Sequence, residues 1–300
     1  MPLRKDCDGI VSAAIASVLP DAAVERVLEG RAFANGTGRL LLVAVGKAAW
    51  QMAAAAERML GRRIDGGIVI TKHGYGKGPI GDLLIREAGH PVPDKDTFSA
   101  TEEALAMTEG LSGEDTVLFL VSGGGSALFE APLVPPEELT DVTDRLLRAG
   151  ADIVEMNTVR KRLSAVKGGR FAAHCAPAKV FSIILSDVLG DPVDMIASGP
   201  ACGDSSTCGE AVAIAEKYGL ALSAEGWACL HQETPKDAPN VETLVTGSVR
   251  CLCQAAAEAA RERGYEPVVL TASLDCEARE AGRVLAAIAR DHSGDGVPPA

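Results

Sequence analysis

The chain has 300 residues, of which 47% are hydrophobic, and its 41 acidic and 29 basic residues give a formal net charge of −12. This length and apolar content are enough for a large buried core in one or two domains. The acidic surplus argues against nucleic acid as the main partner, because no basic excess remains to neutralise phosphates.

The N-terminal segment MPLRKDCDGI carries charges and lacks the apolar stretch of a signal peptide. No apolar run reaches the ~18 residues that a membrane span needs. The eight cysteines form no CxxC pair, so neither a zinc site nor a disulfide framework is expected. We therefore expect a cytoplasmic protein, with no membrane or nucleic-acid partner, whose thiols are reduced and mostly buried.

Apolar runs alternate with amphipathic stretches along the first half of the chain. A helix is predicted at 8–30, with an interruption at Pro20. Continuous apolar runs predict buried strands at 40–45, 68–71, 83–86 and 116–121. Helices are expected between these strands, at 47–60 and 96–111.

The second half continues this alternation. Helices are predicted at 136–149, 152–173, 208–218, 223–230, 249–263 and 277–290, and strands at 180–185 and 267–271. The polar, Pro-containing stretch 231–240 predicts a boundary between a domain at 1–235 and a second one at 241–300. The alternation predicts an α/β fold with a Rossmann-like parallel sheet and helices on both faces.

A Gly-rich loop follows the predicted strand at 116–121, and it consists of Ser122, Gly123, Gly124, Gly125 and Ser126. In parallel sheets, ligands bind outside the carboxyl ends of the strands. Three consecutive glycines leave backbone N–H groups open to an anion, and a helix that starts at Ser126 would add its positive end. The loop therefore predicts phosphate or carboxylate binding; the alternative is a tight turn that needs positive φ.

Charged residues follow two further predicted strands. Lys47 could place its ammonium beside a bound phosphoryl group, although a solvated lysine in a first helical turn is the commoner case. Asp187 and Asp191 lie four residues apart in SDVLGD, and paired carboxylates can hold Mg²⁺. Asp187 could instead accept a proton from a substrate hydroxyl, or simply cap a turn.

The segment 156–170 is basic in an acidic protein. Its Arg160 and Lys167 could clamp a carboxylate or a phosphate, while the neighbouring charged residues are expected on a solvated helix face. His90, in the loop GHPVPD, could donate to a ligand or be structural. The chain contains no G-x-x-x-x-G-K-[ST], no protein-kinase signature set, and no G-x-G-x-x-G after its first strand. A standard P-loop NTPase is thereby excluded, and a dinucleotide site lacks its fingerprint.

Six motifs, in this order, resemble the glycerate 2-kinase family, whose C-terminal part is called the MOFRL domain. They are VGKAA at 45–49, GHPVPD at 89–94, SGGGSAL at 122–128, MNTVRKRLSAVKGG at 156–169, SDVLGD at 186–191 and IASGP at 196–200. The resemblance implies transfer of the ATP γ-phosphoryl group to the 2-hydroxyl of D-glycerate, with Mg²⁺, in a cleft between two lobes. It makes Lys47 and Asp187 the catalytic residues and the Gly-rich loop the phosphate site. Metal binding by Asp187 and Asp191, and glycerate binding by Arg160, Lys167, His90 and Asn157, are further implications.

The sequence departs from the family pattern in two places. IASGP is followed by ACGDSST where the family has a threonine and a short Asp-Pro segment, and the chain stops at Ala300 where family members continue. We therefore expect residues 241–300 to be the start of an incomplete second α/β lobe with an exposed apolar face.

Three alternatives to a complete kinase stay open. The chain could be a phosphate- or sugar-acid-binding module, or one half of a split enzyme that a C-terminal lobe completes in trans, with a homodimer as another arrangement. An NAD(P)-dependent hydroxypyruvate reductase would need a dinucleotide site that the sequence does not display.

Overall fold

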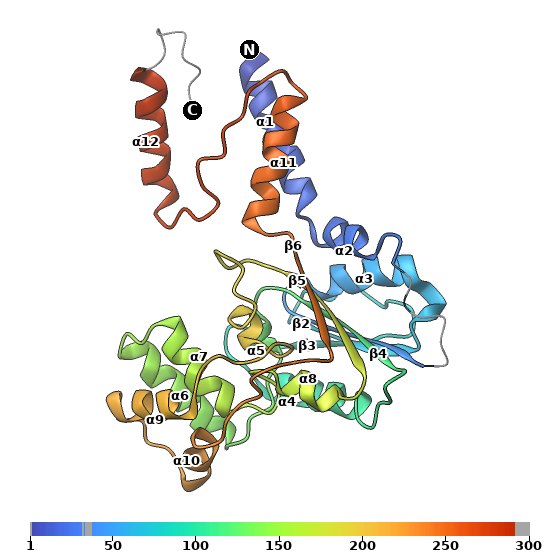
Figure 1. Cartoon of the computed structure of the whole chain (residues 1–300), viewed down its shortest axis with the longest axis vertical. Helices are drawn as coiled ribbons and strands as arrows, with labels where there is room; N and C mark the ends of the chain where they lie inside the picture. The colour runs from blue at the N-terminus through green and yellow to red at the C-terminus, as the bar shows by residue number, and fades with distance from the viewer. Residues whose placement is uncertain (1, 32, 34–37, 292–300) are drawn as a thin grey trace. The chain divides into compact units, whose positions relative to one another are not determined.

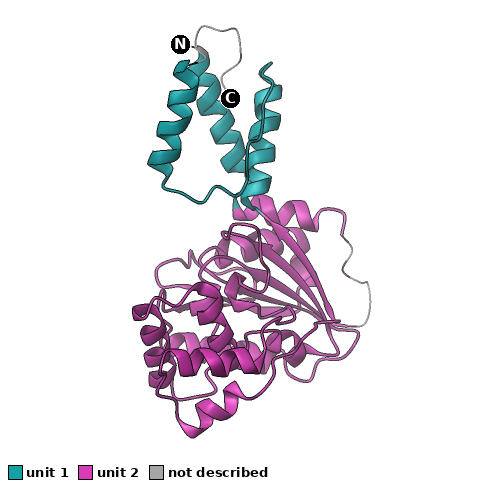
Figure 2. Cartoon of the chain, turned by 60° about the vertical axis from the view of Figure 1, so that its left-hand side comes forward, with its two compact units in different colours: residues 1–19, 247–300 teal, residues 20–246 magenta. Residues whose placement is uncertain are grey.

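The computed structural model describes residues 2–31, 33 and 38–291. The chain forms two compact units (Figure 2): residues 20–246, and residues 1–19 together with 247–300. The sequence places a domain boundary between 235 and 241, whereas these units divide after Leu19 and after Thr246.

The larger unit contains one sheet of six parallel strands, as the predicted α/β fold requires. They are β1 (Leu40–Val45), β2 (Gly66–Lys72), β3 (Leu84–Ala88), β4 (Thr116–Val121), β5 (Lys179–Leu185) and β6 (Val241–Thr246). Their order is β3-β2-β1-β4-β5-β6. The order of the strands reverses between β1 and β4, which makes this pair the topological switch point of the sheet.

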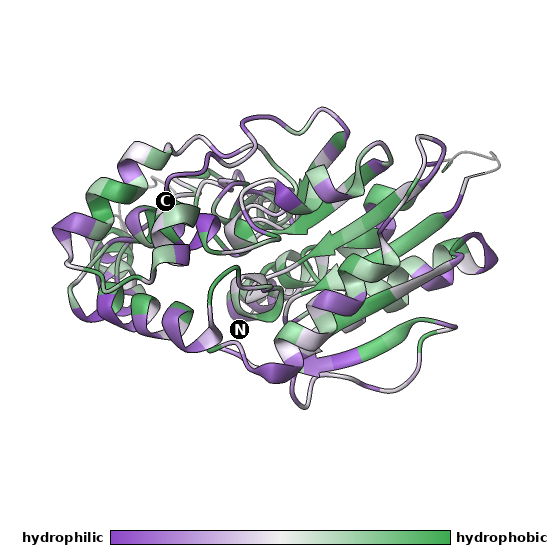
Figure 3. Ribbon diagram, turned by 90° about the horizontal axis from the view of Figure 1, so that it is seen from below, coloured by the Kyte–Doolittle hydropathy of each residue, from purple (hydrophilic) through white to green (hydrophobic). Residues whose placement is uncertain are grey.

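Helices cover both faces of the sheet (Figures 1 and 3), and the central strands β1 and β4 are built almost entirely of apolar residues. One face packs on α2 (Pro20–Leu28) and α3 (Ala49–Leu60), followed by the short helix η1 (Gly61–Arg63). The other packs on α4 (Lys95–Met107), α5 (Gly125–Leu128) and α8 (Arg170–Cys175). Successive residues of each strand point to opposite faces, so Leu42 faces α3 while Val43 and Val45 face the α4 side.

A second cluster of helices lies beside the sheet (Figure 1). It consists of α6 (Pro136–Arg148), α7 (Ile153–Arg162), α9 (Cys208–Lys217) and α10 (Ala224–Leu230), with Val142, Leu146 and Val159 in its core. The helix predicted at 152–173 is in fact two helices. α7 ends at Arg162, Ser164 then forms a β-bridge with Pro132, and α8 begins at Arg170 after Gly168 and Gly169, whose φ of 56° and 80° keep this part of the backbone out of a helix.

Two strand predictions change in the structure. β6 was not predicted, because it is an edge strand whose residues are only partly buried and show no continuous apolar run. The strand predicted at 267–271 is wrong. Val268 and Leu270 there are 72% and 63% exposed. A single apolar run is not stable as a strand unless it pairs with another strand and buries one face, and no described strand pairs with this one.

The smaller unit contains α1 (Pro2–Ser17), α11 (Val249–Arg261) and α12 (Ala278–Asp291). α1 packs along α11, and the Tyr265 hydroxyl donates to Asp6 at 2.9 Å. α12 has no buried residue, and Val284 and Leu285 remain 60% and 46% exposed, as expected for an apolar face without a partner. Within the described residues no single helix is long and apolar enough to cross a membrane; only α1 and α2, counted together, reach that length and composition.

All eight cysteines are free. The prediction that most are buried is wrong, since only Cys175 is buried and Cys7 and Cys276 are exposed. Burial raises the pKa of the Cys175 thiol to about 12, so this side chain acts as a small apolar group in the core.

Candidate active site

The loops after β1 and β4 meet at the switch point of the sheet. Val45 pairs with Val121 at the ends of these strands. Beyond them, the Lys47 N–H donates to the Gly123 carbonyl at 2.9 Å and the Ala48 N–H donates to the Ser122 hydroxyl at 3.0 Å. These bonds hold Lys47 and the Gly-rich loop side by side, at the place where parallel α/β sheets bind ligands.

Three predicted side chains converge on the glycines of this loop. A methyl group on Gly123 would lie 2.0 Å from Oδ2 of Asp187. One on Gly124 would lie 2.9 Å from Nε2 of His90 and 3.2 Å from Cγ of Lys47. Residues from the ends of β1, β3 and β5 therefore approach the backbone of the loop, and only glycine leaves them room.

The conformation of Gly124 adds a second requirement, because its φ of 89° disfavours any side chain. We expect Gly124→Ala to lower activity at least tenfold, since the new methyl group must displace His90 or Lys47. The matched control is Gly110→Ala, where φ is also positive, at 64°, but no atom lies within 4 Å of the added methyl group. Equal activity losses in the two variants, measured as kcat/KM, would contradict the crowding at Gly124.

The helix that follows the loop, α5, has only four residues. The sequence predicts that the positive end of a helix at Ser126 assists anion binding. So short a helix has few aligned peptide dipoles, and the loop must rely on its own N–H groups and on the neighbouring cations.

The side chains around the loop carry unneutralised charge. Lys47 and the exposed Asp187 form no ion pair within the described part of the chain. Burial lowers the pKa of the half-buried His90 below its ordinary value, and the positive charges of Lys47 and Lys72 lower it further. His90 is thus neutral at pH 7 and can still donate one hydrogen bond.

Asn157 and Arg160 reach the other end of the loop from α7. The Arg160 guanidinium donates to the Ser126 carbonyl at 3.2 Å, and its side chain is 12% exposed. Asn157 is buried and accepts a hydrogen bond at 2.9 Å from Ser198, whose hydroxyl lies 3.0 Å from that of Ser126. Both predicted residues are therefore close to the loop, Arg160 at its surface and Asn157 beneath it.

Ser198 was not predicted as a site residue. It belongs to the short helix η2 (Ile196–Ser198), where Ala197 and Ser198 have φ of 52° and 62°. Two successive non-glycine residues with positive φ mark a strained backbone, and such strain gathers at functional sites. The sequence signal is the motif IASGP, but nothing in it indicates that the serine hydroxyl turns toward Ser126.

Lys167 lies away from the exposed surface of the loop. Its side chain is fully buried, where the ammonium donates to the Phe129 carbonyl at 2.8 Å and pairs with Glu130 at 3.0 Å. Burial lowers the pKa of Lys167 to about 8. Glu130 also lies 4.0 Å from Arg160. Lys167 therefore acts on the site indirectly, through Glu130 and Arg160.

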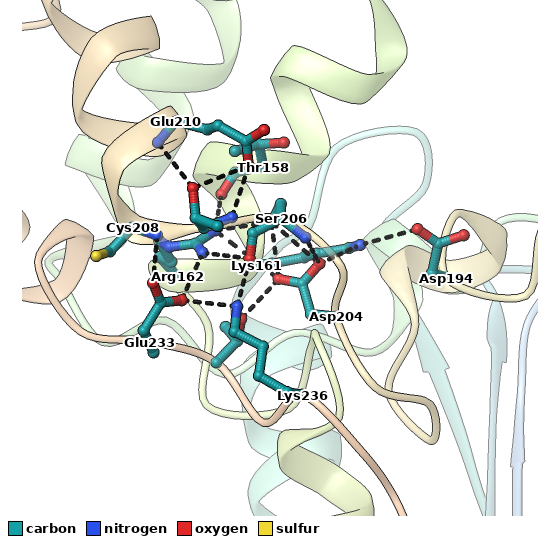
Figure 4. Close-up of polar contacts among 12 residues, drawn as sticks. Thr158, Lys161, Arg162, Asp194, Asp204, Ser206, Cys208, Glu210, Glu233 and Lys236 are labelled. Atoms are coloured by element: carbon teal, nitrogen blue, oxygen red, sulfur yellow. Dashed lines mark hydrogen bonds and ion pairs between the residues drawn. The ribbon is translucent and has the colours of Figure 1, made fainter.

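The other basic residues of α7 do not form a solvated face, and that prediction is wrong. Lys161 and Arg162 are 1% and 0% exposed, and both point into a buried polar network (Figure 4). Asp204 accepts from Lys161 at 3.0 Å and from Thr234 at 2.7 Å. Arg162 donates to the Ser206 carbonyl at 2.9 Å and to Glu233 at 3.3 Å. The network ties α7 to the segments around 204 and 233.

The loop after β5 carries the two carboxylates of the predicted metal site, Asp187 and Asp191. Both carboxylates lie on that loop, and Asp191 takes a positive φ of 55°. Among the described residues, one group of three potential ligands has its atoms within 4.8 Å of one another: His73, Asp94 and Asp96. There, however, Asp94 already caps α4 and accepts from His73 at 2.9 Å. In the part of the chain that the structure describes, Asp187 makes no such hydrogen bond or ion pair, so it is the freer oxygen donor.

Comparisons with known proteins agree on one family. A family model described as "Domain of unknown function (DUF4147)" matches residues 6–230. A D-glycerate 2-kinase of Thermotoga maritima is 50% identical over 96% of this chain and 69% of its own length. A protein of Agrobacterium vitis named "Putative hydroxypyruvate reductase" is 42% identical over 97% of this chain and 66% of its own length.

A solved structure shows the same fold. The crystal structure of a glycerate kinase from Thermotoga maritima superimposes with a TM-score of 0.94 at 49% identity, and the match covers 99% of this chain and 71% of that one. The chain thus spans about two thirds of the length of the proteins it matches.

Proposed function

This chain belongs to the glycerate 2-kinase family, and on that premise we propose that it transfers the γ-phosphoryl group of ATP to the 2-hydroxyl of D-glycerate. The observation that carries the proposal is the convergence of Lys47, His90 and Asp187 on the Gly-rich loop at the switch point. Phosphoryl transfer requires positioned phosphates and stabilised charge more than covalent chemistry, and this site supplies both.

Each group has a place in such a transfer. The backbone N–H groups of Gly123 and Gly124 hold phosphate oxygens, since that of Gly125 donates to the Ser122 carbonyl, while the Lys47 ammonium neutralises charge that develops on the transferring group. Asp187, with Asp191, would hold the Mg²⁺ that shields the phosphates when it is bound. Asp187 lies against Gly123, so it is also the carboxylate that can orient the acceptor hydroxyl and take its proton.

Arg160 and His90 are the proposed contacts of the glycerate carboxylate. Arg160 presents a guanidinium at the Ser126 end of the loop, and guanidinium groups bind carboxylates in a bidentate fashion. His90 lies beside Gly124, and its neutral ring can donate one N–H to the substrate. Asn157 supports Ser198 from below, and Lys167, with Glu130, holds the position of Arg160.

The proposal predicts that the 300-residue chain releases ADP from Mg-ATP in the presence of D-glycerate, with less release for L-glycerate and none without an acceptor. A coupled assay for ADP measures this, and far-UV circular dichroism shows whether the protein is folded. No acceptor-dependent release from folded protein would overturn the proposal for this chain by itself and favour a binding module or a half-enzyme.

The name of the Agrobacterium relative makes a reductase the second candidate. Oxidation of NADH in the presence of hydroxypyruvate, followed by its absorbance, tests it directly. The residues after β1 read GKAAW and do not form the G-x-G-x-x-G turn, so we expect no NADH oxidation.

We also propose the finer assignments that go with this activity: residues 1–235 as a glycerate kinase N-terminal domain, 241–300 as the beginning of a C-terminal lobe, and a cytoplasmic location. A homodimer or a lobe supplied in trans would complete the cleft. The exposed apolar side chains of α12 support such a partner.

A further inference from the structure

Lys72 ends β2 at the same edge of the sheet as Lys47, and the transfer described above gives it no role. Val45, the last residue of β1, pairs with Ile70, so Lys47 in the turn after β1 and Lys72 at the end of β2 both lie two residues beyond this pair. The Thr71 hydroxyl, which points toward the Lys47 carbonyl at 3.5 Å, agrees with this register.

The alternation of side chains puts Lys72 on the same face as the site. Ile68 and Ile70 of β2 pack into the core on the α4 and α5 side, so Lys72 continues their direction. Val45 of β1 and Ala88 of β3 face the same core, two residues before Lys47 and His90. Lys47 and His90 both approach Gly124 of the Gly-rich loop, and α5, which begins in that loop, contacts β2.

Two acidic residues that contact the loop after β2 are already engaged. Glu87 accepts from the N–H groups of Gly74 at 3.0 Å and Gly76 at 2.8 Å. Asp94 pairs with His73 at 2.9 Å and caps α4. Within the described residues Lys72 forms no ion pair, and its half-buried ammonium lies 5.4 Å from the centre of the Tyr75 ring.

Charge is thus sorted across the site. The ammonium groups of Lys47, after β1, and Lys72, at the end of β2, lie on one side of the Gly-rich loop. The carboxylate of Asp187 follows β5, on the other side of that loop. His90 lies within the influence of both ammonium groups, since their charges lower its pKa. In a protein of net charge −12, two uncompensated ammonium groups at one half-buried edge favour an anion as their counterpart.

We propose that Lys72 binds an oxyanion of a substrate at the β2 side of the site, either the carboxylate of the acceptor or a phosphate of the nucleotide. This inference rests on the proposed function for the identity of the two substrates. It extends the anion site by one strand, from the switch point between β1 and β4 to the end of β2.

The test compares Lys72→Ala, Lys72→Arg and the control Lys77→Ala. Lys77 lies in the loop that follows β2 and is exposed, with its ammonium 5.8 Å from the centre of the Trp50 ring. We expect Lys72→Ala to raise the KM and the Kd of one substrate about 10- to 100-fold, because a charge-assisted hydrogen bond is lost. Lys72→Arg should restore most of this affinity, and Lys77→Ala should behave like the unchanged protein.

Titration calorimetry with ATP, D-glycerate and 2-phosphoglycerate, in parallel with steady-state kinetics, separates the outcomes. A selective loss for D-glycerate identifies the carboxylate, and a selective loss for ATP identifies a phosphate. Unchanged affinity for all three ligands in Lys72→Ala overturns the inference even if the protein is an active kinase. Lys72-dependent binding without turnover would retain the inference and reject the proposed activity, and wild-type protein that neither binds nor turns over would reject both.

Discussion

Replacement of Lys47 by alanine is expected to lower kcat about 100- to 1,000-fold, the usual cost of removing one group that stabilises transition-state charge. The Lys47 ammonium has no partner within the described residues, while its backbone N–H holds the Gly123 carbonyl. Alanine keeps that backbone bond and removes only the charge. The loop should therefore stay in place, and the melting temperature should change little.

Steady-state kinetics with Mg-ATP and D-glycerate, together with a thermal melt, check this expectation. Lys95→Ala is a suitable control, because Lys95 is exposed in the first turn of α4 and should tolerate the change. Lys47→Arg shows whether charge alone is sufficient. A kcat of Lys47→Ala within a factor of three of the unchanged protein would remove Lys47 from the proposed chemistry.

Asp204→Ala is expected to destabilise the larger unit by about 3–5 kcal/mol, the usual range when one partner of a buried ion pair is removed. Asp204 is 1% exposed and accepts from Lys161, Thr234 and Ser206. Without it, the one ionic partner that the buried ammonium of Lys161 keeps among the described residues is Asp194, at 3.6 Å. An uncompensated buried charge is costly because it has left water without replacing its hydration.

Urea denaturation followed by circular dichroism measures this loss. The matched control is Asp144→Ala on α6, where the carboxylate is half exposed and pairs with Arg148 at 3.6 Å on the surface. Such a pair contributes little, so the midpoint of unfolding should scarcely move. Similar midpoints for the two variants would show that the network of Figure 4 does not hold α7 in place.

Much of the site follows from local sequence. Continuous apolar runs predict β1 and β4, and a parallel sheet brings the residues after such strands to one edge. This reasoning places Lys47 beside the Gly-rich loop before any coordinates are known, and the bond from Lys47 to Gly123 agrees. Ser198 and Lys72 could not be assigned in this way, because their roles depend on which neighbours share their face.

The sequence by itself determined the central strands, the turns that follow them and the residue types at those turns, because buried parallel strands need apolar side chains on both faces. Only the tertiary structure decided the rest. The edge strand β6 forms because β5 pairs with it, and the run at 267–271 forms no strand because no described strand lies beside it. Three basic side chains can be buried because acidic partners neutralise them: Lys161 pairs with Asp204, Arg162 with Glu233 and Lys167 with Glu130. These partners lie 37 to 71 residues away along the chain, a separation that no local sequence pattern encodes.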